Sequence, residues 1–330
     1  MDIIRRSVLI GGSDVISQSD KYLNSYFTIE ALESGLSVCL STTGCEYCVD
    51  NDGNWKTLSA YIYTVSINAG QTLSFRGNLN PVVDVGIGTF TISKKCNLKG
   101  NIMSLLYGDN FADKTDLTGK DYAFYNLFKN CTTVINTINL ILPATTLVMR
   151  CYSGMFRDCT GLISAPELPA TTLTSWCYTG MFWGCTSLTT APELPAYNID
   201  ERCYYYMFKN CYSLVNAPKI LPATKLYDAC YSMMFEDCHV LETAPELPAI
   251  DLVIRCYRGM FSRCYKLSYI KALFTYVPTI ESYPSTFYWV DGVSNTGTFV
   301  KNKNANIADL NSSSFGYSGI PTGWTVINNE

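Results

Sequence analysis

One segment recurs five times in tandem, and this repetition limits the possible folds more than any other feature of the sequence. Each copy opens with Cys-Tyr, followed by Met-Phe at the fifth and sixth positions and by a second cysteine at the ninth. The steps between copies are 26, 26, 27 and 26 residues. A degenerate copy begins earlier, at Ala123. Similarity at such a period is typical of stacked repeats, because one copy is too small to bury its own apolar side chains.

Each copy combines two types of local pattern. Cysteine, methionine, phenylalanine and cysteine recur at i, i+4, i+5 and i+8, which predicts one face of a short helix. The segment from Leu162 to Leu168 predicts a brief extended stretch around Pro166, since proline donates no hydrogen bond. We therefore predict an α+β fold, a leucine-rich-repeat solenoid of 26-residue repeats with one short helix and one short strand each. The predicted structural core consists of Cys151, Phe156, Cys159, Cys177, Phe182, Cys185, Cys203, Phe208, Cys211, Cys230, Phe235, Cys238, Cys256, Phe261 and Cys264.

Fifteen cysteines would ordinarily indicate a disulfide-rich chain. Eleven of them occupy the two fixed repeat positions, and the other four are Cys39, Cys45, Cys48 and Cys96. A residue repeated at one position is most simply a column of small buried side chains. The pattern favours free buried thiols, and oxidation of some facing pairs is the alternative.

The flanking segments predict four further parts. Residues 1–21 are an N-terminal arm, and residues 22–100 carry short β-prone segments between turns, typical of an antiparallel β-sandwich-like domain. Residues 101–122 are a junction that caps the repeats, which occupy residues 123–274. Residues 275–330 predict a small β cap, anchored by Phe287, Tyr288, Trp289 and Trp324.

The composition argues against several functional classes. Charged residues make up 16% of the chain and the net charge is -4, so we expect no nucleic-acid partner. No apolar run approaches the roughly 18 residues of a membrane span. Residues 1–10 show neither the apolar core nor the cleavage site of a secretory leader.

Catalytic and metal-binding patterns are weak throughout the sequence. His239 is the only histidine, and we interpret it as a surface variant. Cys45 and Cys48 form half a zinc site or a redox pair, but a second pair at matching spacing is absent. The turn from Asp50 to Asn54 begins like a calcium loop without the glutamate at its twelfth position. We predict a non-enzymatic protein with no catalytic residue, no metal and no cofactor.

Positions that vary within the constant repeat are candidates for binding. They are Arg157, Asp158, Trp183, Gly184, Lys209, Asn210, Glu236, Asp237, Ser262 and Arg263. Large aromatic side chains dominate binding hot spots, so Trp183 and the run of three tyrosines from Tyr204 are the strongest candidates. The predicted binding surface consists of Trp183, Tyr204, Tyr205, Tyr206, Lys209, Glu236 and Arg258.

Two further columns allow two interpretations each. The tyrosine after each opening cysteine is either a structural stack with partly solvated hydroxyls or a ligand platform. This column contains Tyr152, Tyr178, Tyr204, Tyr231 and Tyr257. The column Glu167, Glu193, Lys219 and Glu246 is either a solvated edge, in which the lysine relieves charge repulsion, or a polar recognition strip.

The repeat phrases MFRDCTGLISAPELPATTL and MFWGCTSLTTAPELPA resemble the leucine-rich repeats of the BspA-like class. The stretches SINAGQTLSFRGNL, MSLLYGDNF and GIPTGWTV are similar to the accompanying parts of such surface proteins from gut Bacteroidetes and their phages. The resemblance implies surface display and adhesion, and it names no ligand. The opening cysteine departs from the pattern, in which an aliphatic residue is more usual.

Two functions are therefore predicted. The first is a surface recognition or adhesion protein that presents its repeats to a protein or glycan on a host or microbial surface. The second is a structural or receptor-binding component of a phage virion, anchored by its N-terminal region to other virion proteins. The family resemblance favours the first, and the lack of a visible leader favours the second. Genes for tail proteins or for lipoprotein export beside this one would separate them.

Overall fold

The computed structural model describes residues 22–40, 44–58, 63–79, 89–278, 284–306, 310 and 318–330. The predicted N-terminal arm, residues 1–21, lies outside the described residues.

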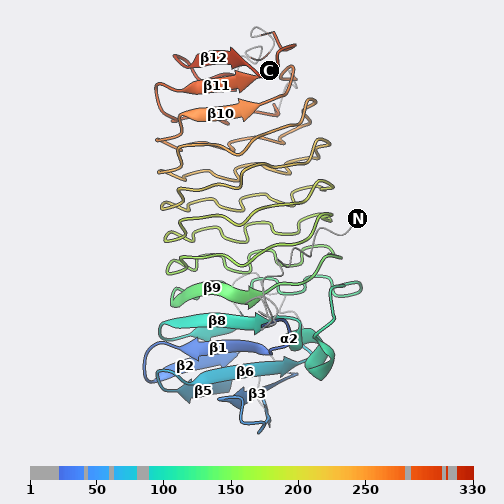
Figure 1. Cartoon of the computed structure of the whole chain (residues 1–330), viewed down its shortest axis with the longest axis vertical. Helices are drawn as coiled ribbons and strands as arrows, with labels where there is room; N and C mark the ends of the chain where they lie inside the picture. The colour runs from blue at the N-terminus through green and yellow to red at the C-terminus, as the bar shows by residue number, and fades with distance from the viewer. Residues whose placement is uncertain are drawn as a thin grey trace, which may run out of the picture.

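Eight short strands make up the N-terminal part (Figure 1). They are β1 (Phe27–Ala31), β2 (Leu36–Leu40), β3 (Cys45–Val49), β4 (Lys56–Thr57), β5 (Tyr63–Ile67), β6 (Thr72–Gly77), β7 (Phe90–Ile92) and β8 (Cys96–Asn101). One sheet has the order β4-β3-β6-β1-β8-β9 and the other the order β5-β2-β7. All pairs are antiparallel except β8 with β9 (Val134–Ile141), which is parallel. The first sheet thus continues from the N-terminal strands into the repeats.

Apolar alternation explains how these two sheets meet. In β2 the buried residues Leu36, Val38 and Leu40 alternate with half-buried ones, as expected for a strand with one face on a core. The Phe90 ring from the second sheet lies 5.6 Å from Phe27 and 5.3 Å from Phe75 of the first, measured between ring centroids. The sheets therefore share an aromatic core.

A short junction connects these sheets to the repeats. It contains the α-helix α2 (Ser104–Tyr107) and the 3-10 helix η1 (Gly108–Asn110). The buried Ser104 hydroxyl accepts a hydrogen bond from the Phe27 N–H at 2.9 Å and donates one to the Phe75 carbonyl at 2.8 Å. This side chain therefore ties the junction to β1 and β6.

The predicted leucine-rich-repeat solenoid of helix-plus-strand units is wrong. Between β9 and β10 (Tyr269–Ala272) the chain consists of turns and isolated parallel bridges, and residues 123–274 contain no helix. The described residues form mainly small sheets and turns, and α2, of four residues, is the α-helix that lies wholly within them.

The backbone angles explain why no helix forms. At the start of a repeat every second residue has positive φ, as at Arg150 (59°), Tyr152 (58°) and Gly154 (63°). An α-helix needs the right-handed conformation at every residue. The N–H groups of Ser153 and Met155 donate to carbonyls three residues earlier in the same repeat. The N–H groups of Gly154 and Phe156 donate instead to carbonyls of the following repeat. The segment is therefore a train of tight turns.

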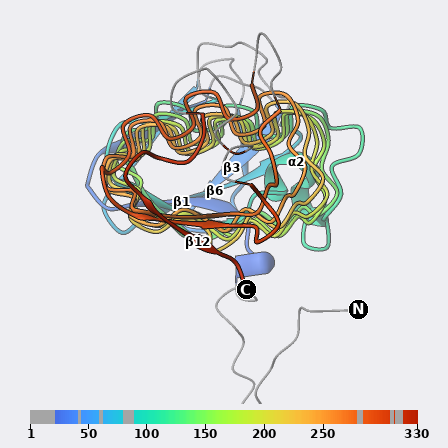
Figure 2. The same cartoon turned by 90° about the horizontal axis from the view of Figure 1, so that it is seen from above.

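Each repeat forms one layer, and successive layers lie one above another (Figure 1). Seen along the stack, the layers superimpose on one oval outline (Figure 2). One long side follows the wavy turn segments, residues 150–158 and their equivalents, and we name it the turn face. The opposite long side carries the extended segments, residues 162–168 and their equivalents, and it continues the sheets at both ends.

Two ladders of aromatic rings fill the interior of the layers. The phenylalanines from Phe128 to Phe261 stack at 5.5–5.8 Å between centroids, with ring planes within 16° of parallel. The tyrosines from Tyr152 to Tyr257 stack at 5.5–6.1 Å beside them. All fifteen residues predicted for the core have 0% exposed surface.

The stack ends on a three-stranded parallel sheet of β10, β11 (Thr298–Lys301) and β12 (Thr325–Asn328). Trp289 is fully buried and lies 6.3 Å from Tyr257 and 6.1 Å from Phe261, so it terminates both ladders. Of the four predicted anchors, Trp289 and Trp324 are buried, whereas Phe287 is half-buried and Tyr288 is exposed.

Candidate functional site

The cysteine columns serve the interior rather than the surface. The thiol of the second cysteine in each layer donates to the phenylalanine carbonyl of the layer before it, for example from Cys185 to Phe156 at 3.1 Å and from Cys211 to Phe182 at 3.2 Å. Burial raises the pKa of these thiols, and a protonated buried thiol is a poor nucleophile. All fifteen cysteines are free, with Cys151 and Cys177 sulfurs 3.5 Å apart.

The tyrosine column is buried as well, so the expected solvation of its hydroxyls is wrong. Burial raises the pKa of all five phenols. The hydroxyls of Tyr152 and Tyr231 are buried without a hydrogen-bond partner. Tyr204 belongs to this ladder and is only 1% exposed, so its predicted place on the binding surface is corrected.

Instead, the turn face carries an open pocket of about 220 Å³. We name it the arginine–tryptophan groove, and its principal lining residues are Arg150, Arg157, Trp176, Trp183, Tyr205 and Tyr206. Gly154 and Gly180 also line it, and the missing side chains leave space between the larger ones. Four consecutive layers contribute, because the stacking brings residues about 26 positions apart side by side.

Both tryptophans lie between cationic side chains of neighbouring layers. The Trp176 ring has the guanidinium carbons of Arg150 and Arg202 each 4.6 Å from its centroid. The Trp183 ring has Arg157 at 3.7 Å and the Lys209 ammonium at 5.9 Å. Cation–π attraction therefore orients both indoles and the arginines that cover them.

Two tyrosines complete the groove beside Trp183. The Tyr206 ring lies 5.0 Å from Trp183 and 3.7 Å from Tyr205, measured between centroids. The Lys209 ammonium lies 4.9 Å from the Tyr206 ring. Burial, and next the hydrogen bond with Tyr205, raise the pKa of Tyr206. The structure thus brings together four residues of the predicted binding surface, namely Trp183, Tyr205, Tyr206 and Lys209.

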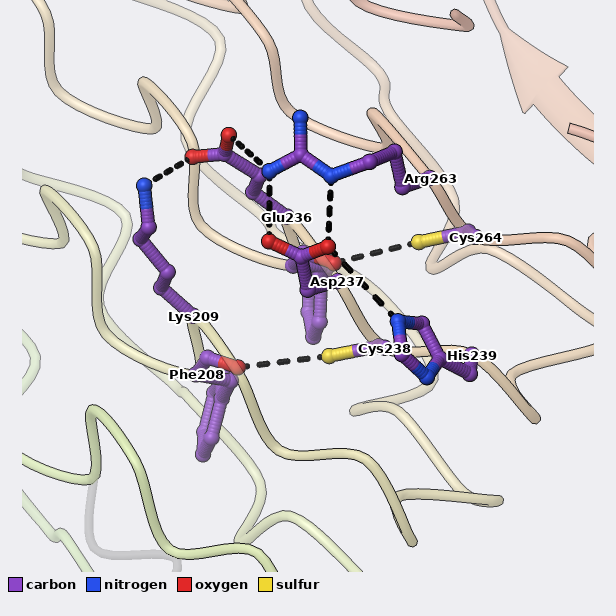
Figure 3. Close-up of polar contacts among 9 residues, drawn as sticks. Phe208, Lys209, Glu236, Asp237, Cys238, His239, Arg263 and Cys264 are labelled. Carbon is purple, nitrogen blue, oxygen red and sulfur yellow. Dashed lines mark hydrogen bonds and ion pairs between the residues drawn. The ribbon is translucent and has the colours of Figure 1, made fainter. Parts of the chain in front are cut away.

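Glu236, another predicted surface residue, belongs to a charge network that Lys209 joins to Trp183 and Tyr206 (Figure 3). Glu236 is only 8% exposed and accepts from Lys209 at 2.5 Å and from Arg263 at 2.7 Å. Arg263 also donates two hydrogen bonds, both 2.6 Å, to Asp237. Burial raises the pKa of Asp237, but the hydrogen bond and charge of Arg263 outweigh burial, so the pKa is lowered. Arg258 lines a second pocket, of about 210 Å³, beside Glu236 and Arg263.

Among the principal groove residues, Arg157 was predicted only as a variable candidate position, and Arg150 and Trp176 were not predicted at all. A signal for the latter two is present in the sequence, because the residue before each opening cysteine reads Arg150, Trp176 and Arg202 in successive copies. In stacked copies this alternation places a cation on both faces of one indole.

The predicted polar strip lies away from the groove. Glu167, Glu193 and Lys219 are exposed, and Glu246 is half-buried with its carboxylate 2.8 Å from the Lys271 ammonium. The Lys219 backbone N–H donates to the Glu193 carboxylate at 3.3 Å. The Lys271 ammonium offsets the charge of Glu246, whereas the Glu167 and Glu193 carboxylates are exposed to solvent.

The other motifs have structural placements. The His239 ring lies between Tyr212 and Tyr265, at 4.7 and 5.0 Å. Cys45 and Cys48 are buried in β3. Within the described ranges, no three His, Cys, Asp or Glu side chains come together as a metal site.

Comparison of the chain with protein-family models, with curated proteins and with solved structures found no match. The BspA-like resemblance therefore stays a prediction from the repeat motif. No helix in the described part of the chain is both long and apolar enough to cross a membrane.

Proposed function

We propose that this chain is a non-enzymatic recognition protein that presents its turn face to a protein or glycan partner on a host or microbial surface. The observation that carries the proposal is the arginine–tryptophan groove, where Trp176, Trp183 and two tyrosines surround one opening. Tryptophan, tyrosine and arginine are the residues most enriched in binding hot spots.

Contacts with neighbouring layers fix the positions of these side chains, which supports the same proposal. Trp183 contacts Arg157 of the layer before it and Tyr206 of the layer after it, so its position is set before any partner arrives. Association then orders few additional side chains. Each side chain that is already ordered saves roughly 0.5–1.5 kcal/mol of the free energy that ordering on binding would cost. A surface held by two neighbouring layers is suited to specific contact.

The test is binding of the labelled protein to an array of glycans and extracellular proteins. We expect the wild type to bind particular members and the double variant Trp183→Ala/Tyr205→Ala to lose that binding. The matched control is Tyr197→Ala/Tyr276→Ala, which removes two exposed tyrosines outside the groove. An unchanged signal for the groove variant, or no binding by the wild type, would contradict the proposal.

A further inference from the structure

The faces of the tryptophans are not the available part of the groove. Trp176 has a guanidinium on each side, both at 4.6 Å. Trp183 is covered by Arg157 at 3.7 Å and by the Tyr206 ring at 5.0 Å. A ligand in the groove therefore meets the edges of the rings and the N–H groups at the edges of the stacked guanidiniums.

The charge of the groove is positive and incompletely balanced. None of the lining residues is acidic. Among the described residues, no carboxylate oxygen lies within ion-pair distance of Arg150. Arg157 has one loose contact, 3.4 Å from Nε to the Asp158 carboxylate, and that Nε makes no hydrogen bond. The groove is thus a cationic site on a chain whose net charge is -4.

Another arginine on the same face shows the opposite arrangement. Arg263 is bound by the carboxylates of Glu236 and Asp237 at 2.7 and 2.6 Å. Its hydrogen-bonding capacity is largely used within the protein, whereas that of Arg150 and Arg157 is not. Planar guanidiniums with free edges recognise oxyanions through paired hydrogen bonds.

We propose that the arginine–tryptophan groove binds an acidic sugar unit of a glycan, with Arg150 and Arg157 donating to its carboxylate or sulfate. This inference rests on the proposed recognition function and specifies the chemistry of its ligand. Stacking on the indoles holds both guanidiniums in place, so little ordering remains to be done when the ligand binds.

Three observations favour a sugar over a peptide. The backbone N–H groups of residues 150–158 and 176–184 all donate within or between layers, so none remains to pair with a peptide main chain. The pocket of about 220 Å³ is smaller than the roughly 300–1,000 Å³ of pockets for drug-sized ligands, which suits one sugar ring. Tyr125, Tyr205 and Tyr206 in the lining add side chains able to bond hydroxyls.

The test is titration of the full chain with four trimeric probes while tryptophan fluorescence is recorded. The probes are galacturonic acid, sulfated galactose, neutral galactose and glutamate trimers. We expect saturable binding of the galacturonate trimer, the sulfated trimer or both, weakened by added salt because the contacts are ionic. The double variant Arg150→Gln/Arg157→Gln is expected to bind at least tenfold more weakly, about 1.4 kcal/mol.

The control is Lys225→Gln/Lys303→Gln, which also removes two positive charges, from exposed side chains that do not line the groove, and should bind like the wild type. Circular dichroism and thermal unfolding verify that each variant is folded. Equal binding of neutral galactose, equal or stronger binding of the glutamate trimer, unchanged affinity in the arginine variant, or no saturable signal would each overturn the inference. If a partner found on the array still requires Trp183 and Tyr205 for binding in those cases, the recognition function stands. Only the assignment of an acidic glycan as its ligand then fails.

Discussion

At the scale of single residues, the repeated cysteines combine small volume with one hydrogen-bond donor. The carbonyls of Phe156 and Phe182 face the layer interior, and the thiols of Cys185 and Cys211 donate to them. Serine would place a more polar group in an apolar interior. Alanine would remove the thiol donor and leave a small void in place of the sulfur, although the Phe156 and Phe182 carbonyls would keep the hydrogen bonds from the Cys159 and Cys185 N–H groups. Cysteine at each of these positions therefore has a physical reason that does not involve disulfides.

The thiols predict a loss of stability in alkali. Burial raises the pKa of Cys131 and Cys230 to about 12, whereas the pKa of a thiol in an unfolded chain is about 8.5. Below that lower value both states hold the proton, so stability does not change. Above it the unfolded chain releases protons that the folded chain keeps, so each such thiol lowers the free energy of unfolding by about 1.4 kcal/mol per pH unit.

We expect urea midpoints measured under reducing conditions to agree between pH 6.5 and 7.5 and to fall steadily from pH 8.5 to 9.5. The measurements stay below the ordinary tyrosine pKa of about 10, so the phenols contribute little. A midpoint that stays constant or rises across the upper interval would show that the thiols are not buried.

At the scale of elements, the repeat period predicted stacking and the positions of the buried side chains, but it did not predict the backbone. Apolar residues at i and i+4 suit one face of a helix, and they also suit a train of turns whose alternate N–H groups point to the next layer. Glycine was an incomplete guide to positive φ, because Tyr206 (59°) and Met233 (53°) adopt it at the position where Gly154 and Gly180 stand in other copies. Hydrogen bonding between layers, which is not local in sequence, decides the conformation.

Gly161 of the first full repeat packs closely against the backbone of the layer before it. A Cβ atom added at Gly161 would lie 2.4 Å from the Thr132 carbonyl oxygen. The same position is Ser187 in the next copy, where a side chain is accommodated. We expect Gly161→Ala to lower the free energy of unfolding by about 1–3 kcal/mol through overpacking. Ser187→Ala should change it by less than about 0.5 kcal/mol.

Urea denaturation of both variants measures this difference. Equal stability of the two would mean that the first layer is not seated on the Thr132 backbone as the structure has it.

At the scale of the whole molecule, one apolar interior runs from the N-terminal sheets to the C-terminal sheet. Phe128 contacts Phe27 and Phe90 at 5.5 and 5.2 Å and begins the phenylalanine ladder, and Trp289 ends it. The sequence indicated the recurrence of these rings, because each occupies a fixed repeat position. A ladder of this kind links each layer to its neighbours, so the repeats should unfold together.

The candidate site was only partly predictable at this scale. Trp183, Tyr205 and Tyr206 stood out as aromatics at variable positions. Trp176 did not, because its importance depends on Arg150 and Arg202 lying above and below it, which only the stacking of layers establishes. Tyr204 was misplaced because three consecutive tyrosines look alike in sequence although one enters the core.

The most direct test of the stacked layers is native-state amide hydrogen exchange, resolved by residue. The N–H groups of Phe156, Phe182, Phe208 and Phe235 donate to the next layer at 2.8–3.0 Å. We expect these amides to be protected with one common free energy, because they open only when the whole stack unfolds. Rapid exchange at these amides, or a separate free energy for each repeat, would contradict the continuous interior and the groove that depends on it.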